Sequence, residues 1–179
     1  MKKNILFALC LLLIVTLGCN MLMPTQEPDL PSSSPTLENA SDTENSALVN
    51  IYDPARNPAD DLAQAIVIAQ KENKRIMLEL GGDWCIWCKY MDEFYETHPD
   101  ILKYRAENYV LVKVNVSEES SNAQFLSQYP EAGGYPHVYI LDSDGTFLHS
   151  QDTVELEDGE ASYVPEVFMA FLQKWAPVK

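Results

Sequence analysis

The feature that most constrains the fold is a pair of cysteines, Cys85 and Cys88, at the junction between a predicted strand and a predicted helix. The strand is the apolar run at 75–81, and the helix carries Met91 and Phe94 at helical intervals. Cysteines three positions apart at the start of a helix lie on one face of it. Such a pair suits a redox couple, half of a metal site or a structural disulfide.

The chain from residue 51 onward alternates between helical and extended patterns. The first expected element is a helix of about 4 turns from Pro58, with Asn57 as its N-cap, followed by a strand at 75–81 and a helix from the cysteines to just before 97–100. A strand at 109–116 and a short helix within 117–132, with Ser117 as its N-cap, come next. Strands at 137–142 and 146–152 and a helix at 164–176 complete the order. The apolar face of the last helix is made of Val167, Phe168, Phe171, Leu172 and Trp175. This order predicts an α/β fold with a central mixed β-sheet flanked by helices.

Length and charge exclude several classes of protein. With 179 residues, the chain has room for one domain with an adequate core and hardly for two. Its formal charge is −15, and it lacks the clustered Lys and Arg that phosphate binding needs, so no nucleic acid is expected as a partner. Solubility alone explains the acidity equally well.

Residues 1–18 are typical of a secretory signal peptide. Lys2 and Lys3 precede an apolar run at 5–17, which is too short for an ordinary membrane span. The run ends in Gly-Cys, at Cys19, and this resembles the bacterial lipoprotein signal, in which the cysteine is lipidated after cleavage. The resemblance implies a lipid anchor on Cys19 at a bacterial membrane. An ordinary signal peptide or a short anchor is the alternative.

Residues 19–50 separate this signal from the folded part. They are rich in Pro, Ser, Thr, Asn and acidic residues and show no apolar periodicity. Such a segment cannot bury enough surface to offset the entropy lost on ordering. We therefore expect a disordered tether that holds a domain at 51–179 away from the membrane.

The positions of the four cysteines bear on the role of the pair. The lipoprotein resemblance implies that Cys10 leaves with the cleaved signal and that Cys19 is occupied by lipid. On that expectation, Cys85 and Cys88 can bridge only each other within one chain. A disulfide that closes so short a loop stabilises the fold little, because its stabilisation grows with loop length. A helix N-terminus favours the thiolate of Cys85, which makes Cys85 the attacking sulfur and Cys88 the resolving one.

Four features match one family. They are the motif WCIWCK at 84–89, Pro136 before an apolar strand, Glu79 six residues before the first cysteine of the motif, and FLQKW at 171–175 in the closing helix. With these features the chain resembles thioredoxin-like thiol-disulfide oxidoreductases over roughly 57–177, and in particular their exported bacterial lipoprotein branch.

The resemblance implies a thioredoxin-like fold and a role for each site residue. Cys85 and Cys88 form the redox-active pair, and Glu79 accepts the proton of the resolving cysteine. The implied substrate groove and its support are Trp84, Trp87, Tyr135, a cis Pro136 and Lys89. Each role has a plainer alternative, such as an exposed strand residue for Glu79, a trans loop proline for Pro136 and a solvated side chain for Lys89.

The expected function is that of an extracytoplasmic, membrane-tethered thiol-disulfide oxidoreductase in the periplasm or at the cell surface. We expect it to reduce protein disulfides rather than to form them. Its expected partners are protein thiols and disulfides and a membrane electron donor. No metal, and no cofactor beyond the Cys85–Cys88 disulfide, is expected.

Three alternatives stay open. Ile86 and Trp87 match neither thioredoxin itself nor the strong oxidants, so the protein could also work as an oxidant or isomerase. A second alternative is a module that delivers copper or zinc, in which Met91 or His137 adds a ligand to the two thiolates. The third is a thioredoxin-fold scaffold whose cysteine pair is idle.

Overall fold

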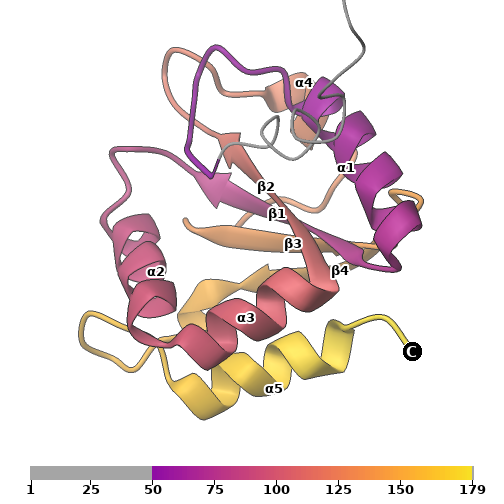
Figure 1. Cartoon of the computed structure of the whole chain (residues 1–179). Coiled ribbons are helices and arrows are strands. Elements are labelled where there is room, and N and C mark those ends of the chain that lie inside the picture. The colour runs from indigo at the N-terminus through magenta and orange to yellow at the C-terminus, as the bar shows by residue number, and fades with distance from the viewer. Residues whose placement is uncertain (1–49, 179) are drawn as a thin grey trace, which may run out of the picture. The chain divides into compact units, whose positions relative to one another are not determined.

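The structure is a computed structural model that describes residues 50–178. These residues form a four-stranded sheet and the helices that pack on it (Figure 1). The strands are β1 (Arg75–Gly81), β2 (Tyr109–Asn115), β3 (His137–Leu141) and β4 (Phe147–Asp152). They stand in the order β2-β1-β3-β4. β1 and β2 are parallel, whereas β3 runs antiparallel to both β1 and β4. The predicted mixed sheet is confirmed.

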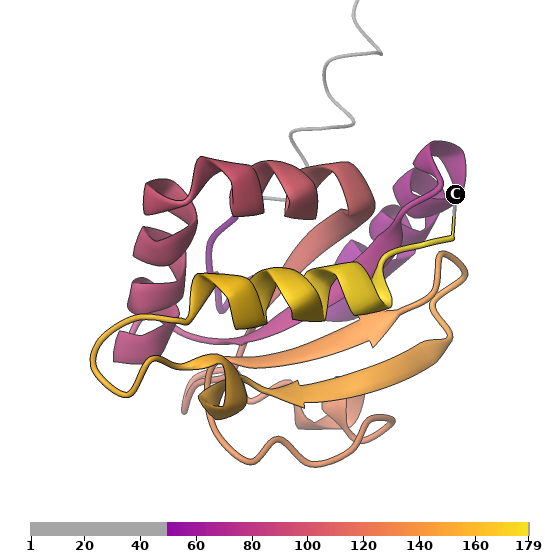
Figure 2. The ribbon, with the colours of Figure 1, turned by 90° about the horizontal axis from the view of Figure 1, so that it is seen from below.

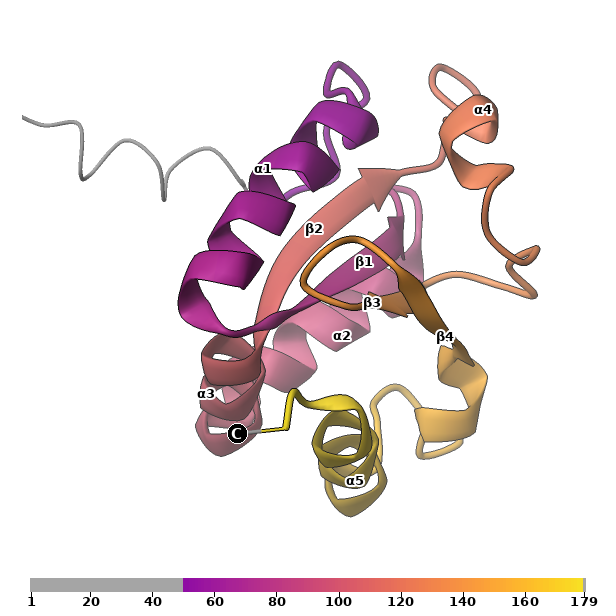
Figure 3. The same cartoon turned by 90° about the vertical axis from the view of Figure 1, so that its right-hand side faces the viewer.

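Helices cover both faces of the sheet. They are α1 (Pro58–Glu72), α2 (Ile86–Thr97), α3 (Pro99–Asn108), α4 (Ala123–Leu126) and α5 (Pro165–Trp175), with a short 3-10 helix η1 (Thr153–Leu156) after β4. α1 and α4 pack on one face, and α2, α3 and α5 pack on the other (Figure 3). Figure 2 shows α3 and α5 running side by side on that second face.

β1 contributes to the apolar core on each face because successive side chains of a strand point to opposite sides. Ile76 and Leu78 belong to the core beneath α1, and Met77 belongs to the core beneath α2. Glu79 is on the same side of the strand as Met77. The alternation therefore places a carboxylate in the interior on the α2 side of the sheet.

Local sequence explains where the helices begin and end. The Oδ1 of Asn57 accepts a hydrogen bond from the Ala59 N–H at 3.0 Å, and Pro58 occupies the first helical position, so the predicted N-cap is confirmed. Asn73 ends α1 in the left-handed conformation that terminates many helices. Pro99 follows the end of α2 and opens α3, where a missing N–H costs nothing.

Three expectations about the elements are wrong. No helix was expected at 99–108, where α3 lies with Ile101 buried. Ser117 is not an N-cap: α4 begins after Asn122, and the Ser117 Oγ accepts a hydrogen bond from the Ser120 N–H in a turn. Val167 is 43% exposed, so it does not belong to the buried face of α5.

The expectations for the signal peptide at 1–18, for lipidation of Cys19 and for nearly all of the tether at 19–50 lie outside the described residues. Within 50–178, no helix is long and apolar enough to cross a membrane.

Candidate active site

Cys85 and Cys88 form a disulfide at the N-terminus of α2. Cys85 is the N-cap, and its Sγ accepts a hydrogen bond from the Cys88 N–H at 3.1 Å. Both cysteines are buried, with 3% and 1% of their surface exposed. Because the first turn of a helix has N–H groups without helical partners, the position suits a negatively charged sulfur on Cys85.

The two tryptophans of the motif lie on different sides of the disulfide. Trp84 is 58% exposed, donates its Nε1–H to the Val116 carbonyl at 2.8 Å and meets the ring of Tyr135 edge-on. Trp87 is partly buried, and its ring contacts Tyr163. Both Trp87 and Tyr135 also pack against the cysteine pair. Tyr135 therefore lies between the cysteine pair and the exposed ring of Trp84 in the chain of contacts.

Pro136 is buried directly after Tyr135, and the peptide bond between them is cis, as the resemblance implied. Its carbonyl accepts a hydrogen bond from the Thr153 hydroxyl at 2.5 Å. That bond connects the loop before β3 to η1.

Glu79 is completely buried. Its Oε1 accepts a hydrogen bond from the Tyr52 hydroxyl at 2.6 Å and lies 3.4 Å from Nζ of Lys113, the residue opposite it in the β1–β2 register. Its Oε2 is also buried and has no hydrogen-bond partner. The alternative of an exposed strand residue is therefore wrong.

Lys113 connects this carboxylate to the surface. Its Nζ is buried and donates to both carboxylate oxygens of Asp92, at 2.6 and 2.8 Å. The Asp92 side chain is 42% exposed. A continuous row of charged groups thus runs from the interior of the sheet to the surface of α2.

Sequence reasoning missed Tyr52, Lys113 and Asp92. A signal existed for Lys113, because a charged residue inside the otherwise buried strand at 109–116 needs a partner. Asp92 is seven residues after Cys85, which is two turns along the same helix face. Tyr52 had no signal, because it comes from an irregular segment before α1.

Two buried tyrosines near the disulfide keep their protons over a wide pH range. Burial raises the pKa of Tyr52 well above its ordinary value, and the neighbouring Glu79 raises it further. Burial also raises the pKa of Tyr163, whose hydroxyl is 3.1 Å from the Trp87 carbonyl. Both phenols are therefore hydrogen-bond donors under ordinary conditions.

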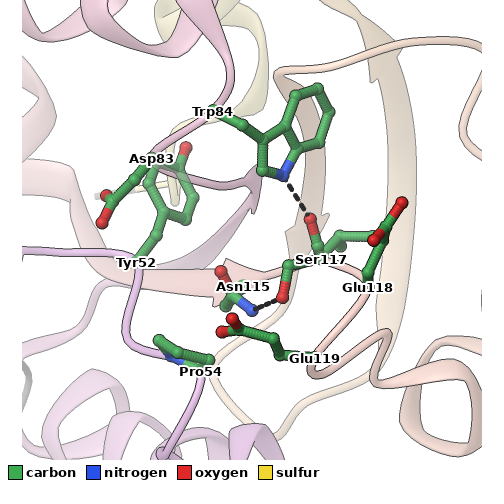
Figure 4. A pocket seen from close by; sticks show the side chains of 9 residues that line it. Tyr52, Pro54, Asp83, Trp84, Asn115, Ser117, Glu118 and Glu119 are labelled. Atoms are coloured by element: carbon green, nitrogen blue, oxygen red, sulfur yellow. Dashed lines mark hydrogen bonds between the residues drawn. The ribbon is translucent and has the colours of Figure 1, made fainter.

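A pocket opens beside Trp84 (Figure 4). Residues from the segment before α1, from the β1–α2 loop and from the end of β2 line it: Tyr52, Pro54, Asp83, Trp84, Asn115, Val116, Ser117, Glu118 and Glu119. Three of these carry carboxylates, and a hydrogen bond of 3.0 Å from Asn115 to Ser117 shapes the far wall. The pocket next to the motif is therefore acidic.

The remaining candidate residues are not part of the buried cluster around Cys85 and Cys88. Lys89 is exposed on α2, and Met91 is buried in the apolar core. His137 is buried, and its Nε2 lies 2.7 Å from the Ser150 hydroxyl. Among residues 50–178, no three His, Cys, Asp or Glu side chains gather closely enough to hold a metal ion.

Several known proteins are similar to this chain in sequence. The thiol:disulfide interchange protein DsbD of Escherichia coli K12 is 31% identical over 86 residues, which cover 48% of this chain and 15% of that protein. DsbD of Klebsiella pneumoniae is 26% identical over 115 residues, covering 64% of this chain and 18% of that protein. The chain thus spans less than a fifth of the length of these relatives.

Solved structures share the fold. The disulphide isomerase of Xylella fastidiosa matches with a TM-score of 0.59 and 21% identity, over 70% of this chain and 97% of that one. The oxidised C-terminal domain of Neisseria meningitidis DsbD matches with a TM-score of 0.50 and 18% identity, over 70% and 98%. Residues 57–143 match the model of the thioredoxin-like family, within the span of the predicted resemblance. Over residues 57–143 the chain is therefore thioredoxin-like in sequence as well as in fold.

Proposed function

We propose that this protein is a thiol-disulfide oxidoreductase that reduces disulfides in other proteins outside the cytoplasm. The observation that carries the proposal is the Cys85–Cys88 disulfide at the N-terminus of α2. It packs against Tyr135, which precedes cis Pro136, and against Tyr52, which donates to the buried carboxylate of Glu79. The sequence similarity of this chain to the DsbD proteins supports the proposal.

The geometry gives each sulfur a step. In the reduced protein, the Cys85 thiolate attacks one sulfur of a substrate disulfide, the substrate S–S bond breaks, and one substrate thiol leaves. Cys88, one turn deeper, then attacks Cys85 and forms the disulfide seen here, and the second substrate sulfur leaves as a thiol. The substrate gains two electrons, which the cysteine pair loses.

Glu79 is the proposed acceptor of the Cys88 proton. A buried thiol needs a base inside the protein, because the thiolate is the form that attacks. The carboxylate is held by Tyr52 and Lys113 on one oxygen only. Trp84, Trp87, Tyr135 and Pro136 would border the bound substrate, with Lys89 in support at the edge.

Reduction of further substrate requires a new pair of electrons each time. We assign their supply to a dithiol protein or another donor in the membrane, which would exchange disulfides with Cys85 in the reverse order. A lipid on Cys19 would hold the domain near that donor. Replacing Cys19 with Ala should move the protein from the membrane fraction to the soluble fraction, and a variant that stays with the membrane would contradict the anchor.

Two cysteine variants test the function directly. In an assay of insulin reduction with dithiothreitol as the electron source, Cys85→Ser should lose all activity above background, because it lacks the attacking sulfur. Cys88→Ser should lose turnover but accumulate mixed disulfides through Cys85, visible as adducts on non-reducing gels. If both variants reduce insulin as fast as the parent chain, the proposed function is wrong.

A further inference from the structure

Tyr52 lies outside residues 57–143 that match the family, yet its side chain touches both parts of the proposed chemistry. Its ring packs against Cys85 and Cys88, and only 6% of the residue is exposed. Its hydroxyl donates to Oε1 of Glu79 at 2.6 Å. The phenol therefore connects the cysteine pair to the buried carboxylate.

The bare Cα of Gly81 leaves space beside both the Cys88 sulfur and the Tyr52 hydroxyl. A Cβ at this position would lie 2.3 Å from Sγ of Cys88 and 2.9 Å from the hydroxyl oxygen of Tyr52. A side chain at residue 81 would thus occupy the space that the sulfur and the hydroxyl share. The same hydroxyl is the one that bonds to Glu79.

Cys88 needs an internal route for its proton. It is 1% exposed, so bulk water does not reach it, and it must become a thiolate before it attacks. Burial and the adjacent Glu79 both raise the pKa of the Tyr52 phenol, so its hydroxyl carries a proton at neutral pH. A hydroxyl can also accept a proton through its free lone pairs as it donates its own.

We propose that the Tyr52 hydroxyl relays the proton of Cys88 to Glu79 during the resolving step. This inference rests on the proposed function. The Cys88 proton passes to the Tyr52 oxygen while the Tyr52 proton passes to Oε1 of Glu79. The electron pair left on Cys88 forms the bond to Cys85, the bond from Cys85 to the substrate sulfur breaks, and that sulfur leaves with the electron pair and takes a proton from water.

Charged groups from three elements and one further phenol surround the relay. Glu79 comes from β1, Lys113 from β2 with Nζ 4.6 Å from the Tyr52 ring centroid, and Asp92 from α2. Tyr163, from the segment before α5, is the other titratable group that acts on Tyr52. The Tyr52 ring also lines the pocket of Figure 4, so it forms part of the wall between solvent and this buried cluster.

The test separates the two sulfur steps in time. The reduced protein is mixed with an aromatic disulfide whose thiolate is coloured, so that the first release reports attack by Cys85 and the second reports resolution by Cys88. Tyr52→Phe, which keeps the ring and removes the hydroxyl, should slow the second release by about a hundredfold at neutral pH, the low end of what acid–base groups contribute. The slowing should lessen as pH rises, and the first release should keep its rate.

A matched control and a double variant give the result its meaning. Tyr109→Phe also removes a buried tyrosine hydroxyl, which bonds to the Leu172 carbonyl at 2.6 Å, and should leave both releases unchanged. In a Glu79→Gln background, adding Tyr52→Phe should slow the second release no further, because the relay then has no acceptor. An additional tenfold loss in that background would overturn the relay.

The unchanged protein offers a measurement that does not depend on folding of a variant. The rate of the second release is measured in mixtures of light and heavy water. If two protons move in one step, a plot of this rate against the fraction of heavy water should be curved. A straight line, the mark of one moving proton, or a second release in Tyr52→Phe that equals the parent's, would overturn the relay alone. A parent chain that shows no second release would overturn the proposed function and the relay with it.

Discussion

At the scale of single residues, Gly81 is the position with the least space beside the cysteines. A methyl group there would overlap the Cys88 sulfur and the Tyr52 hydroxyl, which lie 2.3 and 2.9 Å from the Cβ position. We expect Gly81→Ala to lower the free energy of unfolding by about 1–3 kcal/mol, the usual cost of overpacking a core. Urea denaturation of the oxidised protein measures it.

Gly134→Ala is the matched control for that change. A Cβ on Gly134 meets no atom within 4 Å, so this variant should unfold close to the parent. Equal urea midpoints for the two glycine variants would show that the crowding at residue 81 is relieved without cost.

His137 gives a prediction about pH. Burial lowers its pKa, and His149 lowers it further, against an opposing effect of Asp152. The unfolded chain therefore takes up a proton near the ordinary pKa of about 6.5, before the folded protein does. The contribution of His137 to stability is full above that pH and is lost as pH falls toward the lower folded pKa.

The substitution His137→Gln should remove this dependence. Between pH 7.5 and 5.5, values chosen to bracket roughly the ordinary histidine pKa, the parent should lose more stability than the variant in urea denaturation. His98→Gln serves as a comparison at the histidine that caps the C-terminus of α2. If His137→Gln loses as much stability as the parent over this range, burial of His137 has no part in acid sensitivity.

Prediction of single site residues succeeded where a motif fixed the position and failed where only the fold did. Cys85 and Cys88 were identified from the motif at 84–89, and Pro136 from its place before an apolar strand, because both match a known family. Tyr52 could not be found this way, because its contact with Glu79 joins residues 27 positions apart through tertiary packing.

At the scale of the elements, the salt bridges of Lys113 join β2 to β1 and α2. The lysine contacts Glu79 of β1 and Asp92 of α2, and its own side chain is 1% exposed. Lys113→Met should lower the free energy of unfolding by about 3 kcal/mol, because removing one partner leaves a buried carboxylate uncompensated. Thermal or urea unfolding measures the loss.

Lys103→Met provides the contrast on a helix surface. Lys103 and Glu107 form an exposed pair at 3.8 Å along α3, and such pairs contribute about 0.3–0.5 kcal/mol. If both lysine variants lost the same free energy of unfolding, the buried contacts of Lys113 would not stabilise the packing of α2 on the sheet.

The elements themselves were predictable to the extent that periodicity marked them. The strands and the amphipathic helices α1 and α5 have repeating apolar positions, and their order along the chain predicted a mixed sheet. The order of the strands within the sheet, β2-β1-β3-β4, was not predicted, because it depends on tertiary pairing. α3 was missed because its ten residues are mostly polar and begin at Pro99, which reads equally as a break. α4 is a single turn whose start depends on Asn122 in a left-handed conformation, not on a side-chain cap.

At the scale of the whole molecule, the acidic surface and the pocket beside Trp84 set conditions for the substrate. The chain carries a formal charge of −15, and Asp83, Glu118 and Glu119 line that pocket. Disulfides flanked by basic residues would approach this surface more readily than acidic ones. The fold thus places a buried redox pair at the edge of an exposed, negatively charged entrance.

The measurement that most directly tests the central claim is the reduction potential of the Cys85–Cys88 pair, obtained by equilibrating the protein with thiol redox buffers and quantifying free thiols. A protein disulfide reductase should have a value near that of thioredoxin, about −270 mV, because its dithiol must lose electrons readily to substrates. A value near that of the strong oxidant DsbA, about −120 mV, would contradict the account and reverse the proposed direction of electron flow.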